Sequence, residues 1–292
     1  MSGQRLLITG ASGQLGSALL AYPWPSSWEV FGTKRADLDL ADTSSIFGTV
    51  VDLQPTVVVN AAAYTAVDAA EDNQASATLV NDAAVAELVR AAEDLDARIV
   101  HVSTDYVFDG EKSTPYAEDD PTSPVTAYGR TKLAGEGHVG RYSRGVTLRT
   151  AWVYSATGSN FVKTMLRLAH ERDTIGVVND QIGSPTSAED LAAGVAELVT
   201  ANNDVPKRLY HLASPTTTTW YDFARAVLEP EIANGTVEVK PLTTDEFPTV
   251  ASRPKNSQLD CSAIKSDLGI ELQPWSEALV KVRREIEQQG RT

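Results

Sequence analysis

The sequence predicts an α/β protein built on a doubly wound parallel sheet, with a smaller C-terminal lobe. Short β-rich runs alternate with helix-like stretches through the first half of the 292 residues. A glycine-rich turn at residues 10–16 follows the first run and opens the first helix. Beyond about residue 150 the alternation gives way to irregular segments rich in Thr and Pro. This change marks where a second lobe begins.

Each element is predicted from its residue pattern. Apolar and β-branched runs predict sheet strands at 5–9, 29–33, 57–60, 98–103 and 145–149, and a further strand at 175–178. Helices are expected between the first five strands, near 14–20, 44–53, 74–95 and 128–141. The third of these is rich in alanine, the strongest helix former. The resulting order, strand and helix in turn, is that of a parallel sheet with helices on both faces.

We expect the chain to divide into two parts. Residues 1–150 form the sheet domain, and a helix near 188–200 with a strand near 208–212 returns residues 187–213 to it. Residues 151–186 and 214–292 form the smaller lobe, where a substrate would bind. Its loops include 155–160, 180–186 and 215–219.

Composition excludes several classes of function. A net charge of −14 without a basic cluster opposes binding to nucleic acid. The chain has no apolar run of about 18 residues that could span a membrane. The N-terminus runs directly into an apolar strand without a cleavage site, so we expect a soluble cytoplasmic protein. The one cysteine, Cys261, cannot form an internal disulfide and is expected to be an ordinary thiol.

The glycine-rich turn predicts a dinucleotide site. A tight turn from strand to helix brings backbone N–H groups and the helix N-terminus to one point, where a pyrophosphate can bind. Glycine suits this turn because a Cβ would block the pyrophosphate and the close packing of helix on strand. Residues 1–150 are therefore the dinucleotide-binding domain of a Rossmann fold. The predicted contacts are Gly10, Ser12, Gly13, Gln14, Leu15 and Gly16.

The end of the second strand predicts which dinucleotide binds. Lys34 and Arg35 stand where charge-assisted hydrogen bonds could meet a 2′-phosphate, which favours NADPH, with NADH as the second choice. The alternative is that both are solvated loop charges. Asp39, a little further on, is expected to border the adenine, and Leu40 beside it is a further expected cofactor contact.

Tyr128 and Lys132 stand at i and i+4 and so share one face of the predicted fourth helix. A nearby ammonium lowers the pKa of a phenol, which can then protonate a ketone oxygen. The end of the fourth strand, VSTDY at 102–106, supplies a hydroxyl that could hold the same oxygen. The alternative is a surface helix beside an ordinary strand end.

Taken together, these motifs resemble the dTDP-4-dehydrorhamnose reductases of the extended short-chain dehydrogenase/reductase family. The resemblance covers nearly the whole chain. It rests on Gly10/Gly13/Gly16, NAAAYTAVD at 60–68, STDYVFDG at 103–110, Tyr128/Lys132, RTAWVY at 149–154, DQIGSPT at 180–186 and RPKNSQLD at 253–260.

The resemblance implies NAD(P)H-dependent reduction of a dTDP-4-keto-6-deoxyhexose, with Thr104, Tyr128 and Lys132 as the catalytic group. Implied cofactor contacts are Ala62, Ala63, Tyr64, Tyr128 and Lys132. Implied substrate contacts are Thr65, Val67, Thr104, Asp105, Tyr128, Trp152, Arg253 and Asn256. For three of these an ordinary role stays open: a core aromatic for Trp152, a turn residue for Asn256, and a solvated pair for Arg253 with Lys255.

A bound metal is not expected. Some family members resemble magnesium-bridged dimers with a glutamate in the first helix, where this chain has Ser17-Ala18-Leu19, so only Glu189 and Asp190 remain of that arrangement. A Mg²⁺-linked dimer is therefore doubtful, and we expect a monomer or weak homodimer. The four histidines, His101, His138, His170 and His211, lack ligand-spaced companions, which predicts no catalytic metal.

Two rival functions stay open at this point. An epimerase or dehydratase acting on a nucleotide sugar would share the fold and would keep its nicotinamide bound through the cycle. A nucleotide-sensing regulatory subunit is the non-catalytic rival, because fold alone does not fix function. The Tyr128/Lys132 pair argues against a sensor, which has no need of it.

Overall fold

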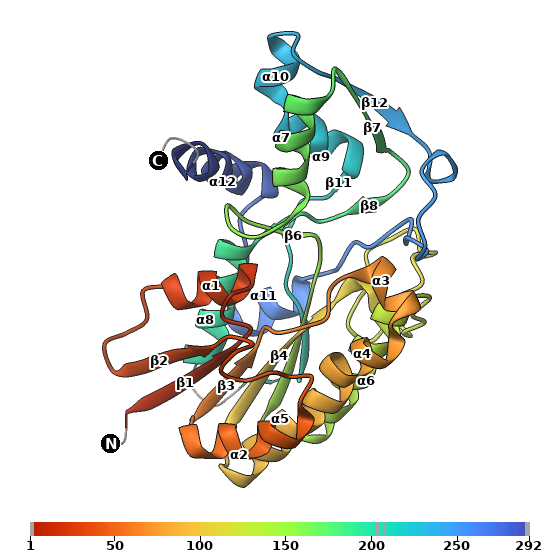
Figure 1. Cartoon of the computed structure of the whole chain (residues 1–292). Helices are drawn as coiled ribbons and strands as arrows, with labels where there is room; N and C mark the ends of the chain where they lie inside the picture. Colours follow the sequence, from red (N-terminus) through yellow and green to blue (C-terminus); the bar gives the residue numbers. More distant parts are fainter. Residues whose placement is uncertain (1–2, 202–204, 207, 290–292) are drawn as a thin grey trace.

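A computed structural model describes residues 3–201, 205–206 and 208–289 of the chain (Figure 1). One half of the molecule is a six-stranded sheet in the order β10-β5-β4-β3-β1-β2, with every neighbouring pair parallel. The doubly wound fold class is therefore confirmed. The strands are β1 (Gln4–Thr9), β2 (Trp28–Thr33), β3 (Val57–Asn60), β4 (Arg98–Thr104), β5 (Gly145–Thr150) and β10 (Leu209–His211).

Helices cover both faces of this sheet. Successive strand residues point to opposite faces, so Leu6 and Ile8 pack toward α1 (Gln14–Ala21) and α8 (Ala188–Thr200). Leu7 packs on the other side, with α2 (Thr43–Leu53) and α5 (Ala84–Asp94). On that same side α6 (Ala127–Arg141) lies against β4 and β5. Two separate apolar cores thus sandwich the sheet.

The predicted helix at 74–95 is interrupted. It consists of α4 (Gln74–Thr78), a π-helical turn η1 (Leu79–Ala83) and α5. The wider turn is a local departure that alanine-rich composition does not reveal. It holds Asn81 with its side chain buried, where the amide bonds both backbone groups of Tyr64. The short α3 (Val67–Asp72), ahead of it, is a helix that the pattern did not predict.

The second lobe has its own core, formed by Tyr154, Phe223 and their neighbours. The strand predicted at 175–178 exists as β7 (Thr174–Val178), but it pairs with β12 (Glu238–Leu242) in this lobe and not with the main sheet. Two-residue strands complete the lobe: β6 (Val153–Tyr154) pairs with β9 (Thr186–Ser187), and β8 (Ile182–Gly183) with β11 (Thr218–Thr219). Its helices are α7 (Phe161–Glu171), α9 (Trp220–Val227), α10 (Glu229–Ala233) and α12 (Trp275–Gln289).

Several remaining segments tie the two parts together. The helix α8 packs on α1, and β10 pairs with β5. The helix α11 (Ser262–Leu268) also packs against the sheet domain, through Ile264. Single helical turns are η2 (Asp105–Val107) and η3 (Thr244–Glu246). Across the described ranges, no helix combines the length and apolarity needed to cross a membrane.

Candidate active site

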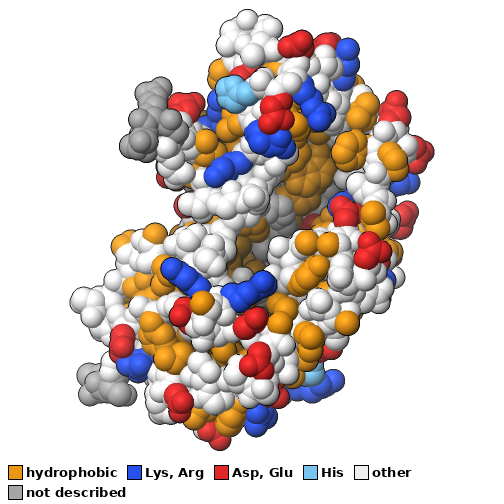
Figure 2. Space-filling view, viewed as in Figure 1, with side chains coloured by type: hydrophobic (Ala, Val, Ile, Leu, Met, Phe, Trp, Pro, Cys, Tyr) orange, Lys and Arg blue, Asp and Glu red, His pale blue; other side chains and the backbone are white. Residues whose placement is uncertain are grey.

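A cavity of about 670 Å³ opens at the carboxyl ends of the sheet strands, facing the second lobe. Figure 2 shows this hollow between the two halves of the molecule. It lies where ligands bind in doubly wound sheets, near the point where the strand order reverses, here between β1 and β3. The sheet domain supplies most of the wall, and the rest comes from Ala151, Trp152, Val153, Gly158, Ser159 and Trp220.

The glycine turn forms one end of the cavity. Gly10 has φ +68°, and a Cβ added there would lie 2.7 Å from the Ala62 Cα. A Cβ on Gly16 would lie 2.1 Å from the Gly10 carbonyl oxygen, so Gly16 allows the helix to pack and does not line the cavity. Within the described chain no side chain caps α1 at Gly13. The first N–H groups of α1 are thus left for an anionic ligand.

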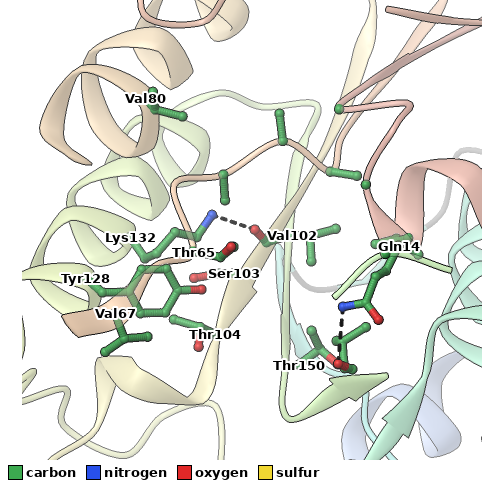
Figure 3. A pocket seen from close by; sticks show the side chains of 18 of the residues that line it. Gln14, Thr65, Val67, Val80, Val102, Ser103, Thr104, Tyr128, Lys132 and Thr150 are labelled. Carbon is green, nitrogen blue, oxygen red and sulfur yellow. Dashed lines mark hydrogen bonds between the residues drawn. The ribbon is translucent and has the colours of Figure 1, made fainter. Parts of the chain in front are cut away.

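Gln14 connects this turn to the second lobe. Its Oε1 accepts hydrogen bonds from Ser155 Oγ at 3.1 Å and Asn160 Nδ2 at 3.0 Å, and its Nε2 donates to the Val153 carbonyl at 3.4 Å (Figure 3). The sequence pattern pointed to Gln14 but gave no signal for Ser155 or Asn160. Their part depends on contacts across about 140 residues of chain.

The two basic residues at the end of β2, Lys34 and Arg35, differ in their position relative to the cavity. Arg35 lines the cavity with its side chain 83% exposed, and its Nε lies 3.9 Å from Asp39 Oδ1. A weak, solvated contact of this kind leaves the guanidinium available to a ligand. Lys34 does not line the cavity. Asp39 and Leu40 do, together with Leu38, which the sequence analysis did not name.

Thr104, Tyr128 and Lys132 all line the cavity and are all buried (Figure 3). Thr104 Oγ1 donates to Asp105 Oδ1 at 2.8 Å and accepts the Tyr106 N–H at 3.2 Å. The Tyr128 ring meets the edge of the Tyr106 ring, with centroids 5.6 Å apart. Burial raises the pKa of Tyr128 above its ordinary value, against a hydrogen bond with Thr104 that lowers it.

Lys132 does not lower the pKa of Tyr128 as the i, i+4 spacing suggested. Its Nζ donates to the Val102 carbonyl at 2.7 Å and lies 3.2 Å from Nε2 of His101 (Figure 3). Burial lowers the pKa of Lys132 to about 8, and the charge of Glu136 opposes this shift. The expectation that the ammonium lowers the pKa of the phenol is therefore corrected. Burial of each group is the largest cause of its pKa shift, raising the pKa of Tyr128 and lowering that of Lys132.

Asp105 carries an unsatisfied carboxylate oxygen. Its Oδ2 is buried and bonds no group among the described residues, although the residue lines the cavity. Burial raises the pKa of Asp105 to about 6. An unpaired buried acceptor is costly, and a ligand hydroxyl at this point would satisfy it.

Trp152 forms the facing wall. It has φ +49°, which is strained for a bulky residue. Its ring stacks on Trp220 with centroids 3.5 Å apart and planes at 6°, and its Nε1 donates to Ser257 Oγ at 3.1 Å. A Cβ on Gly183 would lie 2.3 Å from the same ring. Trp220 could not be predicted from the sequence, because a lone aromatic residue at the start of a helix resembles any core residue.

Of the other predicted cofactor and substrate contacts, some line the cavity and some do not. Ala62, Ala63, Thr65 and Val67 line the cavity. The cavity wall does not include Tyr64, Arg253 or Asn256.

The last two of these lie on the loop that follows η3. Arg253 Nη2 donates to Asp68 at 2.7 Å, while its buried Nη1 has no partner in the described ranges. The Asn256 amide donates to the carbonyls of Lys112 and Thr114 at 2.7 and 3.0 Å, which is the bonding of a turn residue.

A buried ion pair behind the cavity escaped the sequence analysis. Glu136 accepts two hydrogen bonds from Arg149, at 2.9 and 2.7 Å, and a third from Ser103 Oγ at 2.5 Å. Glu136 lies one turn beyond Lys132 on α6. The pair fixes that helix against β4 and β5, since breaking one partner would leave a buried charge.

The family assignment rests on comparison with known proteins. The RmlD substrate binding domain family matches residues 4–288. A protein of Aggregatibacter actinomycetemcomitans named dTDP-4-dehydrorhamnose reductase is 42% identical over 288 residues, covering 96% of this chain and 98% of that protein. The chain belongs to the dTDP-4-dehydrorhamnose reductase family. The resemblance seen in the motifs is thus confirmed, and with it the assignment as an oxidoreductase.

Other members of this reductase family agree across the full chain. A dTDP-4-dehydrorhamnose reductase of Escherichia coli K12 is 37% identical over 292 residues, covering 96% of this chain and 97% of its own. The crystal structure of the Bacillus anthracis reductase in complex with NADP superposes with a TM-score of 0.91 at 34% identity, covering 97% and 99% of the two chains. The expected cofactor class is in accord with that complex. No group of three or more His, Cys, Asp or Glu suited to a metal ion occurs in the ranges 3–201, 205–206 and 208–289.

Proposed function

We propose that this reductase-family chain converts the C4 ketone of dTDP-4-dehydro-L-rhamnose to the alcohol of dTDP-L-rhamnose, with NADPH as the preferred reductant. The observation that carries the proposal is the meeting of Thr104, Tyr128 and Lys132 in one cavity with an uncapped helix N-terminus. The names of the full-length relatives support the substrate.

The sheet domain fits the cofactor. The free N–H groups at the start of α1 would hold the pyrophosphate, where Gly10 and Gly13 leave room. Arg35 would meet the 2′-phosphate, and Asp39 with Leu40 would border the adenosine. Ala62, Ala63 and Lys132 would lie along the nicotinamide half. When bound, NADPH supplies the hydride that C4 of the sugar accepts.

Tyr128 is the proton donor in this proposal. Reduction adds a hydride to carbon and a proton to oxygen, and the raised pKa of Tyr128 keeps the phenol protonated at neutral pH. Thr104 holds the same oxygen through its hydroxyl. To donate to the ketone the Thr104 hydroxyl must turn away from Asp105 Oδ1, to which it donates at 2.8 Å. The proton thus starts on a buried group within the same cavity as the ketone.

The sugar and its diphosphate would lie toward the second lobe. Thr65, Val67 and Trp152 form walls for the deoxyhexose, and Asp105 Oδ2 accepts one of its hydroxyls. Arg253 lies outside the cavity wall, so its side chain would have to turn to bring the unpaired Nη1 to a phosphate oxygen; only Nη2 is held by Asp68. Asn256 contributes by holding the turn that carries Arg253.

The proposal also covers the cellular location and the oligomeric state of the enzyme. The net charge of −14 favours a soluble cytoplasmic enzyme that acts on a small nucleotide sugar. We further propose that it works as a monomer or weak homodimer without bridging Mg²⁺.

Cofactor oxidation tests the function directly. Absorbance of NADPH should fall when dTDP-4-dehydro-L-rhamnose is added to the purified chain, and the product should be dTDP-L-rhamnose. Turnover of a simple ketone with no response to the dTDP sugar contradicts the proposal. Nicotinamide that stays bound and is regenerated within each cycle would instead indicate an epimerase or dehydratase.

A further inference from the structure

A row of buried polar side chains crosses the sheet beside the cavity. Thr9, Asn60 and His101 are register partners on β1, β3 and β4. Thr9 Oγ1 donates to Asn60 Oδ1 at 2.6 Å, and Asn60 Nδ2 lies 2.9 Å from His101 Nδ1. His101 Nε2 then lies 3.2 Å from Lys132 Nζ. Each of the three row residues is almost wholly buried, so each polar atom must find its partner within the protein.

The Asn60 amide has a defined orientation. Its Oδ1 accepts from Thr9 Oγ1 and also from the backbone N–H of Ala62, at 3.3 Å. Its Nδ2 therefore points to His101 and donates. Nδ1 of His101 must then be an acceptor, and a neutral imidazole carries its proton on Nε2. That proton faces Lys132.

A charged Lys132 conflicts with this arrangement. An ammonium has three donors and no acceptor, so an ammonium and an Nε2–H cannot bond one another. A neutral amine resolves the conflict, because its lone pair accepts from His101 Nε2 while one N–H donates to the Val102 carbonyl. A charged ammonium requires the other tautomer of His101, with Nε2 as acceptor and the proton on Nδ1. The Asn60 amide must then turn over, and Ala62 N–H loses its acceptor.

We propose that His101 is a positioning residue whose tautomer and the Asn60 amide change together with the proton on Lys132. Addition of one proton from solvent converts neutral Lys132 to the ammonium, moves the His101 proton from Nε2 to Nδ1, and frees the Ala62 N–H. Ala62 lines the cavity where the cofactor is proposed to bind. The catalytic role of Lys132 rests on the proposed function, but the coupling itself does not.

The surrounding charges permit both states. Glu136 and Tyr128 face Lys132 from one turn away on α6, and Arg149 of β5 pairs with Glu136 at 2.7 Å. Burial lowers the pKa of Lys132 to about 8 and lowers that of His101 well below its ordinary value. His101 therefore stays neutral while Lys132 titrates, and only its tautomer changes.

Nitrogen NMR of the whole chain labelled with ¹⁵N-histidine tests the coupling without any turnover. Imidazole nitrogen shifts distinguish the two neutral tautomers, and His101→Gln identifies the His101 signals. From about pH 6 to about pH 10, we expect His101 to pass from the Nδ1–H to the Nε2–H tautomer with a midpoint near that of Lys132. In Lys132→Met the signals should show one tautomer at every pH. A single tautomer throughout the wild-type titration, or the same change in Lys132→Met, overturns the proposal.

A kinetic measurement adds a second arm. Asn60→Asp places only acceptors beside His101 Nδ1, which holds the Nδ1–H tautomer and keeps Lys132 charged to higher pH. The basic limb of the kcat/KM profile should move up by about one pH unit. An unmoved limb overturns the coupling. Because the added carboxylate also attracts the ammonium directly, the ¹⁵N-histidine spectrum of the same variant must show the Nδ1–H tautomer across the titration, and a change of tautomer there overturns the coupling too. Wild-type protein that reduces no sugar contradicts the proposed function alone and leaves the NMR result standing.

Discussion

At the scale of single residues, the phenol of Tyr128 bears the chemistry. Tyr128→Phe removes the transferable proton and keeps the ring, so kcat should fall by about 10² or more. Cofactor affinity should change little, because the ring still packs on Tyr106. Steady-state kinetics with fluorescence titration of NADPH checks both. Near wild-type kcat in this variant would show that another group is the acid.

Arg35 and Lys34 form a matched pair for cofactor choice. Arg35 lines the cavity and Lys34 does not, although the sequence placed both at the 2′-phosphate. Arg35→Ala should raise KM for NADPH by about tenfold while KM for NADH stays nearly constant, since a charge-assisted bond contributes on the order of 1.5–3 kcal/mol. Lys34→Ala, the control, should leave both constants unchanged. Equal changes in KM for the two cofactors would show that Arg35 is a solvated loop charge that does not contact the 2′-phosphate.

Asp105 makes a prediction about stability. Burial raises its pKa from 3.8 to about 6, so the folded state holds the proton more tightly than the unfolded state does. Below about pH 4 this group therefore leaves the free energy of unfolding unchanged. Above about pH 6 it lowers the free energy of unfolding by its full amount, on the order of 3 kcal/mol. Asp105→Asn should remove that cost. Urea unfolding at several pH values checks it, and wild-type and variant curves that stay parallel across this window refute it.

At the scale of elements, the substrate wall depends on a helix start. α9 begins at Trp220, whose ring supports the strained Trp152. Trp220→Leu removes the stacked face, so KM for the sugar should rise several-fold while cofactor affinity is kept. Loss of the near-ultraviolet circular dichroism of the stacked indoles should accompany it. Trp220→Phe, which keeps an aromatic face, should restore much of the affinity, and failure of both variants to alter KM would remove Trp152 from the sugar site.

The elements also show what sequence can reveal. The strands β1, β3 and β4 were predictable because buried parallel strands are continuous β-branched runs. The glycine turn was predictable because its spacing reflects backbone sterics. By contrast, the two-residue strands β6, β8, β9 and β11 are too short to show a pattern of alternating apolar residues. The π-helical turn at Asn81 is held by a tertiary hydrogen bond to Tyr64. Their formation depends on partners far along the chain.

At the scale of the whole molecule, the residues of the site also fall into those that local sequence predicts and those that depend on partners far along the chain. Tyr128 and Lys132 were found from local spacing and Thr104 from the family resemblance, and all three line the cavity. His101, Glu136 and Trp220 were not, because each acts through a neighbour that only the fold brings near. The proposed boundaries at residues 150, 187 and 213 stay a prediction, although α8 and β10 do pack with the sheet domain.

Gly183 offers a practical use of this architecture. It lies in the second lobe, and only its missing Cβ leaves space for the Trp152 ring. Adding a single methyl group there would push the indole off its stack, while the glycine turn and Arg35 lie on the other half of the cavity. Gly183→Ala is thus a means of weakening sugar binding from the second lobe while reductant binding is kept. Such a variant would suit crystallisation of the cofactor complex.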